Sequence, residues 1–490
     1  MIRTIPRPAR LLLRSAHFAL VCGARLAWPP RGLRPSGMLA LAAGVMLLAA
    51  CGNSAHYPVN GPLGQHDAKE GYRLHRVADD PTNPHDVLVV LSFSGGGMRA
   101  AALAYGTLEA LRDTSVPIGG TRRRLLDEVD VINAVSGGSI VAAYYATYHD
   151  AIFRDFVDSF LRRDVERDLQ LRLATNATRL ASAHFGRTDL LAEYLDERLF
   201  HGETFDDLAH GAFRPYVVIN ASDLSTGARF PFTQAQFDLL CSDLGHVPVA
   251  RAVAASAALP PFFTAITLHN YAGSCNALPP PGLAKAAGEP ADTHGEYARV
   301  RETRSYRDVA RRPYIHLVDG GLIDNLGVRA SIDFAVENGG FPELIEALGY
   351  RDLTHAVFIS VNAQRAPDLS IDQSAEVPSF RRVMRAFELP INAQSLHVSE
   401  ELHASFDRWR EEIARRRASA GSDRVDHEPH FYFIDVSLQA IPDEQERDYF
   451  KQIPTTLTLD AASVDRLRAV ARKLLLSSPD FKQFMTDLGG

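Results

Sequence analysis

Three stretches of the chain share one pattern, a mostly apolar run that ends at glycine-rich residues. They cover residues 86–93, 129–135 and 314–318. Apolar runs of this length bounded by turn residues predict buried strands. The first two are followed by residues 98–112 and 140–145, whose apolar positions favour helices. The pattern therefore predicts strand–turn–helix units and an α/β fold.

The remaining segments extend this prediction. Residues 153–205 are charged and helical in pattern, and residues 272–308, rich in Pro, Ala, Gly and charge, predict a loop. Asp460 is placed to cap a helix whose apolar face includes Val464, Leu467 and Leu474. We expect one α/β domain with a C-terminal elaboration packed on it. Further predicted elements are a hairpin over 216–233, strands over 355–363 and 431–436, and a helical stretch over 379–417.

Ser136 lies in the turn between the predicted strand 129–135 and the helix after it. A serine held between strand and helix, with small residues behind it, is typical of a nucleophile elbow. Gly138 supplies a small residue where strand and helix must approach closely, whereas Ala134 stands where a glycine is more usual. Ser-Gly-Gly is also common turn chemistry, so the motif alone leaves a purely structural turn open.

Gly95, Gly96 and Gly97 follow the predicted strand 86–93, and Met98 begins the helix predicted after them. Unobstructed backbone N–H groups at a helix N-terminus suit a phosphate or an oxyanion. The Gly-Lys-Ser/Thr of a phosphate-binding loop does not follow, and no dinucleotide-binding glycine spacing can be placed. An oxyanion hole therefore remains, beside the alternative of a merely tight turn.

Asp319 ends the predicted strand 314–318 and precedes two glycines. It is placed to accept a proton, although an aspartate that caps the next turn is the alternative. In an open parallel sheet, ligands bind outside the carboxyl ends of the strands. The three segments can therefore converge on one edge of the sheet, where they supply the oxyanion donors, nucleophile and base that acyl transfer requires.

Together these motifs resemble the patatin-like phospholipases, and more narrowly the bacterial patatin-like lipoproteins. The resemblance covers about residues 87–326, and a segment rich in alanine at 250–261 also resembles the family. It implies a three-layer α/β/α fold with a mainly parallel central sheet. It also implies a lipid acyl hydrolase without a cofactor, in which Ser136 and Asp319 form a catalytic dyad and residues 95–98 form the oxyanion hole.

The histidines agree with a dyad, because none sits in a turn at the end of a predicted strand. His316 is nearest to Asp319, and strand alternation places it on the opposite face. Asp319 must then act as the base, which a buried, apolar setting favours by raising its pKa. Arg99 either contacts a lipid phosphate or holds the glycine loop, and Asp324 and Asn325 are expected to cap the loop.

The N-terminus predicts the compartment. Residues 1–37 carry seven arginines and no acidic residue, residues 38–50 are apolar, and Cys51 follows Leu-Ala-Ala. This pattern resembles a bacterial lipoprotein signal peptide that ends at a lipidated Cys51, rather than a buried helix or a cytosolic N-terminus. We expect a protein anchored by lipid in the cell envelope, and the Gly52 after Cys51 favours the outer membrane, facing the periplasm.

Charge and cysteines refine this prediction. The net charge is −7, and loss of the seven arginines with residues 1–50 leaves about −14. An acidic protein is a poor partner for nucleic acid or anionic lipid. Besides Cys51, that chain keeps Cys241 and Cys275, which form either a disulfide or two buried thiols. No calcium loop is present, so we expect no metal requirement.

We therefore expect a serine lipid acyl hydrolase of the phospholipase A or lysophospholipase type, acting on membrane lipid or lysophospholipid. A lipid acyltransferase with the same site and a non-catalytic envelope binding lipoprotein are the alternatives. The expected organisation is a signal peptide over 1–50, a tether over 51–84, a catalytic domain over 85–340 and a C-terminal extension over 341–490. The sequence does not predict the oligomeric state.

Overall fold

The computed structural model describes residues 60–286, 294–364, 372–377, 379, 388–419 and 429–489. The predicted signal peptide lies outside the described residues, and so do residues 51–59 of the predicted tether, Cys51 among them.

A central sheet organises the molecule, with strand order β12-β11-β2-β5-β6-β10-β9 and with β7 paired to β6. The pairings from β12 to β6 are parallel, whereas β7, β9 and β10 pair antiparallel. Small antiparallel pairs join β1 to β8 and β3 to β4. The strands are β1 Gly61–Pro62, β2 Val87–Phe93, β3 Ser115–Ile118, β4 Thr121–Arg124, β5 Val129–Val135, β6 Tyr216–Asp223, β7 Arg229–Pro231, β8 Ser242–Asp243, β9 Ile266–His269, β10 Tyr314–Asp319, β11 His355–Asn362 and β12 His430–Ser437.

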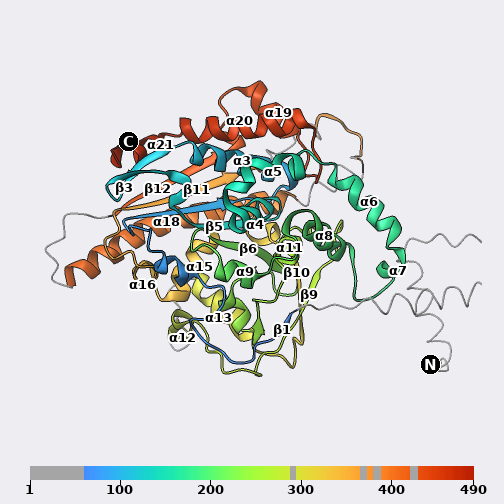
Figure 1. The fold of residues 1–490 in the computed structure, drawn as a ribbon, viewed down its shortest axis with the longest axis horizontal. Coiled ribbons are helices and arrows are strands. Elements are labelled where there is room, and N and C mark those ends of the chain that lie inside the picture. Colours follow the sequence, from blue (N-terminus) through green and yellow to red (C-terminus); the bar gives the residue numbers. More distant parts are fainter. Residues whose placement is uncertain are drawn as a thin grey trace, which may run out of the picture.

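Helices cover both faces of the sheet, so the expected three-layer α/β/α fold with a mainly parallel sheet is confirmed. In Figure 1, α3, α20 and α21 lie above the strands, and α15 and α16 lie below them. The helices are α3 Gly97–Arg112, α4 Gly137–Tyr148, α5 Ile152–Phe156, α6 Val165–Thr175, α7 Ala177–Leu180, α8 Arg187–Leu195, α9 Phe205–His210, α10 Gln234–Asp238, α11 Val249–Ser256, α12 Pro281–Ala286, α13 His294–Tyr306, α14 Gly321–Asp324, α15 Arg329–Asn338, α16 Phe341–Ala347, α18 Glu388–Ser419, α19 Glu444–Gln452, α20 Ala461–Ser477 and α21 Pro479–Asp487.

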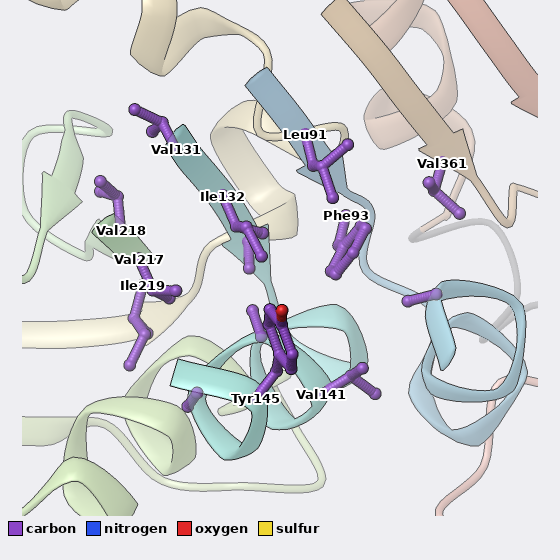
Figure 2. Packing of buried hydrophobic residues seen from close by; sticks show 14 of the residues in the cluster. Leu91, Phe93, Val131, Ile132, Val141, Tyr145, Val217, Val218, Ile219 and Val361 are labelled. Carbon is purple, nitrogen blue, oxygen red and sulfur yellow. The ribbon is translucent and has the colours of Figure 1, made fainter. Parts of the chain in front are cut away.

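The inner strands of the sheet are buried on both faces. Every residue of β2, β5 and β6 is buried, as expected for parallel strands with helices on either side. Figure 2 shows Val141 and Tyr145 of α4 directed toward side chains of β2 and β5, among them Phe93 and Ile132. The helix that follows Ser136 is thereby fixed against the sheet.

One strand departs from the parallel arrangement assumed for the three motifs. β10 runs antiparallel to β6, with Asp319 opposite Ala221, whereas β5 runs parallel to β6, with Val135 opposite Asn220. The carboxyl ends of β5 and β10 therefore approach each other from opposite directions at neighbouring residues of β6. The expected convergence occurs, but register produces it rather than a shared strand direction.

The C-terminal region adds to the same sheet instead of forming a separate body. β11 pairs with both β2 and β12, all in parallel. α20 packs on α3, and the side chain of Asp460 accepts a hydrogen bond from the Ser463 amide at the start of α20, which confirms the predicted cap. The domain boundaries stay predictions, but residues after 340 are structurally continuous with the glycine loop through β11.

Two other segments differ from their expected character. From residue 60 onward, the predicted tether packs on the domain: Tyr72 is buried and stacks on Tyr216, and Arg73 pairs with Asp238. The expected loop over 272–308 contains α12 and α13 on either side of residues 287–293, which lie outside the described residues. Buried Arg299 of α13 pairs with Glu337 of α15, so charge in this segment anchors a helix rather than marking a loop.

Candidate active site

The turn that carries Ser136 has the geometry of a nucleophile elbow. Ser136 follows β5 directly, adopts φ 50° and ψ −122°, and immediately precedes α4. A positive φ is costly for most residues with a side chain, and such strained conformations cluster at functional sites. A Cβ atom on Gly137 would clash with the Gly97 carbonyl oxygen, and one on Gly138 would lie 2.7 Å from the Ser94 carbonyl oxygen. The two glycines therefore let β5, α4 and the glycine loop meet at Ser136.

Ser136 and Asp319 are joined by a hydrogen bond. The Ser136 hydroxyl donates to Oδ2 of Asp319 over 2.9 Å, and the Gly321 amide donates to Oδ1 over 2.7 Å. The side chains are nearly enclosed, with exposed fractions of 8% for Ser136 and 5% for Asp319. The carboxylate is thus held in contact with the hydroxyl by its own following turn.

The environment of Asp319 changes its acid–base behaviour. Burial raises the pKa of the Asp319 carboxyl from 3.8 to about 6, against the opposing effect of the hydrogen bonds from Gly321 and Ser136. Burial disfavours the charged form of a carboxyl, so the carboxylate becomes a stronger base. At neutral pH the group is still mostly ionised and able to accept a proton.

Among the described residues, no histidine forms a hydrogen bond with the side chain of Ser136 or Asp319. The polar partners of the Asp319 carboxylate are the Ser136 hydroxyl and the Gly321 amide. His316 lies on β10, where its Nδ1 is 3.0 Å from the Thr267 hydroxyl on the exposed side of the strand. This is the placement that strand alternation predicted for His316.

The four predicted oxyanion donors fall into two pairs. The Gly95 amide donates to the Asn325 carbonyl at 2.9 Å, and the Met98 amide donates to the Thr456 carbonyl at 2.7 Å. Gly96 and Gly97, with φ of 137° and 61°, take backbone conformations that glycine adopts readily. In the described part of the chain, the amides of Gly96 and Gly97 donate to no protein acceptor. The amides of Gly95 and Met98 thus already have acceptors in this structure, which leaves the amides of Gly96 and Gly97 as the better candidates for the predicted oxyanion hole.

Arg99 hydrogen-bonds to the protein beside the glycine loop and does not face solvent. Its guanidinium is buried and donates to the carbonyls of Ala363 and Ile453 and to the hydroxyl of Thr455. Of the two roles weighed for Arg99, these contacts support the structural one. A phosphate-binding arginine would instead present donors to an open site.

Asp324 and Asn325 hold the turn after Asp319. Asp324 accepts from the Gly327 and Arg329 amides, which is the predicted capping role, and burial raises the pKa of its carboxyl to about 6. The carbonyl of Asn325 holds Gly95, and a Cβ atom on Gly95 would clash with the Asn325 side-chain oxygen. These residues join the glycine loop to the β10 turn.

Two contributors were not singled out from the sequence. The Ser256 hydroxyl accepts a hydrogen bond from the Ser136 amide at 2.8 Å, and the Thr456 carbonyl holds the Met98 amide. Ser256 lies inside the alanine-rich stretch 250–261. Nothing in the local sequence of Thr456 points to the glycine loop.

Two features away from the Ser136–Asp319 pair bear on the remaining predictions. Cys241 and Cys275 form a disulfide with Cα atoms 5.5 Å apart. Among the described residues, no group of three or more His, Cys, Asp or Glu side chains is arranged to hold a metal ion.

Comparison with known proteins places this site in a family. Residues 91–332 match the family model for patatin-like phospholipases, and this range includes the end of β2, Ser136 and Asp319. A solved structure, human GIVD cytosolic phospholipase A2, is similar to the chain at 12% identity with a TM-score of 0.39, over 91% of this chain and 67% of that chain. A search of curated protein sequences found no match. The chain belongs to the patatin-like phospholipases, whose name indicates lipid hydrolysis.

Proposed function

We propose that this patatin-like phospholipase domain hydrolyses acyl esters of phospholipid or lysophospholipid with Ser136 as nucleophile and Asp319 as base. The observation that carries the proposal is the 2.9 Å hydrogen bond from the Ser136 hydroxyl to the Asp319 carboxylate. A nucleophile and its base must be within hydrogen-bonding reach, and this pair is.

The first step forms an acyl-enzyme. Ser136 Oγ bonds to the ester carbonyl carbon while Asp319 Oδ2 takes the hydroxyl proton. The carbonyl oxygen becomes an oxyanion, for which the amides of Gly96 and Gly97 are the candidate donors. Loss of one such donor typically costs about 3 kcal/mol of barrier. Collapse of this intermediate breaks the ester C–O bond, and Asp319 gives its proton to the departing alcohol.

The second step releases the fatty acid. A water molecule gives a proton to Asp319 and attacks the acyl carbon, and Ser136 then recovers its proton as the acyl–serine bond breaks. The same carboxylate thus acts as base and acid twice. A pKa near 6 suits both duties, because the group is ionised at neutral pH yet basic enough to accept a proton.

We also propose that the domain works beside a membrane to which Cys51 anchors it. This rests on the sequence of residues 1–52, since Cys51 lies outside the described residues. Within the described residues, none of the helices has the length and apolarity needed to span a bilayer. Membrane fractionation of the expressed full chain beside Cys51→Ser tests this: the wild type should sediment with membranes and the variant should not. Equal partition of both would contradict the anchor.

Product analysis tests the reaction itself. The full chain in detergent is mixed with a phospholipid and, separately, a lysophospholipid, and the products are identified by mass spectrometry. We expect free fatty acid from wild type and none from Ser136→Ala. In a repeat with an added acceptor alcohol, an acyl ester of that alcohol would favour the transferase alternative. In a repeat with a metal chelator, we expect full activity. Wild type that cleaves neither lipid would overturn the proposal.

A further inference from the structure

The hydroxyl of Ser256 connects the nucleophile turn to the central sheet. Ser256 is the last residue of α11 and is fully buried. Its Oγ accepts from the Ser136 amide at 2.8 Å and donates to the Asn220 carbonyl at 2.6 Å. A hydroxyl has one proton to donate and lone pairs to accept with, so both bonds can exist at once.

The Ser136 amide has need of such a partner. The pairing of β5 with β6 ends at Val135 opposite Asn220, and α4 begins at Gly137, so the Ser136 amide has no partner in either the sheet or the helix. Its φ of 50° is a strained conformation, which persists only where surrounding groups enforce it. Ser256 replaces the missing ladder partner and fixes the direction of the Ser136 peptide.

The backbone at the same helix end holds the other half of the site. The Ser256 carbonyl accepts from the Gly320 amide at 3.1 Å, and the Ala258 carbonyl accepts from the Asp319 amide at 3.1 Å. Gly320 is also packed so tightly that a Cβ atom there would clash with the Asn220 carbonyl. The C-terminal end of α11 therefore binds the chain at Ser136 with a side chain and at Asp319 and Gly320 with its backbone.

We propose that Ser256 is a positioning residue for the nucleophile, and that its hydroxyl sets the Ser136 backbone so that Oγ faces Asp319. This inference rests on the proposed function. The Ser256 hydroxyl touches no reacting atom and acts through the Ser136 amide and the β6 backbone. Its effect should therefore appear in the rate of the chemical step more than in substrate binding.

Ser242 offers a matched control. Its hydroxyl is also fully buried, donates to the Gly61 carbonyl at 2.9 Å and accepts from the Asn60 side-chain amide at 3.0 Å. It holds β1 to the domain and has no assigned contact with Ser136 or Asp319 in the described structure. Ser256→Ala and Ser242→Ala remove hydroxyls of the same kind, one beside the nucleophile and one away from it.

The test compares the rate of labelling by a serine-reactive phosphonate and the separate values of kcat and KM, well below the melting temperature of each variant. We expect Ser256→Ala to lower labelling and kcat about tenfold to a hundredfold with little change in KM, because misplacing reacting groups by about 1 Å costs on the order of a hundredfold. Ser242→Ala should keep the wild-type rates.

Wild-type labelling and kcat in folded Ser256→Ala would overturn the inference while leaving Ser136 as the nucleophile. An equal loss in Ser242→Ala would also overturn it, because the effect would then be general destabilisation. If Ser256→Ala does not fold, Ser256→Cys keeps the side-chain shape with a weaker hydrogen-bonding group: a lowered labelling rate supports the inference and a wild-type rate refutes it. A wild type that is neither labelled nor active would instead fail the proposed function.

Discussion

The amide of Met98, at the start of α3, donates a hydrogen bond of 2.7 Å to the carbonyl of Thr456, which follows α19. A Cβ atom on Gly97 would clash with the same carbonyl oxygen. The segment around Thr456 therefore lies directly on the glycine loop, although it falls well beyond the residues that match the family model. In this chain the C-terminal region is part of the support of the site.

A substitution at Arg99 tests whether the C-terminal region supports the glycine loop, because the Arg99 guanidinium donates to the carbonyls of Ala363 and Ile453. Arg99→Leu leaves buried carbonyls without donors, so we expect a loss of about 2 to 4 kcal/mol in the free energy of unfolding and a large fall in phosphonate labelling. Urea denaturation and labelling rates measure the two effects. Arg122→Ala, at an exposed arginine of β4, serves as the control. Unchanged stability with a selective loss of phospholipid binding would instead favour a phosphate-binding role for Arg99.

A substitution at Gly137 tests the close approach of the chain behind Ser136. Gly137→Ala should favour the helix by about 1 kcal/mol through propensity, yet its Cβ would displace the Gly97 carbonyl and with it the glycine loop. We expect folded protein whose labelling rate is lower by about a hundredfold or more. Gly64→Ala, where no atom lies within 4 Å of an added Cβ, should be neutral. A fully active Gly137→Ala would show that the loop does not need its present position.

The rate should depend on the ionisation of one carboxyl. Because burial raises the pKa of Asp319 to about 6, the base is ionised above that pH and protonated below it. We expect the rate of phosphonate labelling to be flat above about pH 7 and to fall about tenfold per pH unit well below pH 6, with a single-proton slope. Stopped labelling between pH 4.5 and 8, followed by intact mass, gives the profile. A rate independent of pH across this range would contradict Asp319 as the base.

The buried carboxyl of Asp319 should lower the free energy of unfolding at neutral pH. Its pKa is higher in the folded protein than the usual 3.8, so the folded state holds the proton more tightly and wild type loses stability as the pH rises from about 4 to about 6. Asp319→Asn removes this titration and can keep the hydrogen bond from Gly321. We expect the variant to be more stable by about 2 to 3 kcal/mol above pH 7 and little different near pH 4.

Chemical denaturation of wild type and Asp319→Asn at several pH values measures this difference. A variant that is less stable than wild type at pH 7 would show that the ionised carboxylate stabilises the fold, contrary to the account.

Much of the fold was predictable because its inner strands are buried on both faces. The runs at 129–135 and 355–363 correspond to β5 and β11 almost residue for residue, and the glycine turns marked their ends. Strand direction was not predictable. Nothing in the sequence 314–318 distinguishes a parallel from an antiparallel strand, since direction is set by pairing with β6 far away in the chain.

The site shows the same limit. Ser136 and Asp319 could be proposed because each occupies a turn with a chemical signature. The fate of the Gly95 and Met98 amides could not, because their acceptors, Asn325 and Thr456, are contributed by distant segments. Ser256 gave no signal of its own, since a serine among alanines at the end of a helix is ordinary and its role depends on a contact across 120 positions.

The most direct test of the central claim is the labelling of the full chain by a serine-reactive phosphonate, with peptide mapping by mass spectrometry. The account predicts one phosphonyl group per chain on Ser136, no label in Ser136→Ala, and labelling slowed by about a hundredfold or more in Asp319→Asn. Label on another residue, or a wild-type rate in folded Asp319→Asn, would contradict a Ser136–Asp319 dyad.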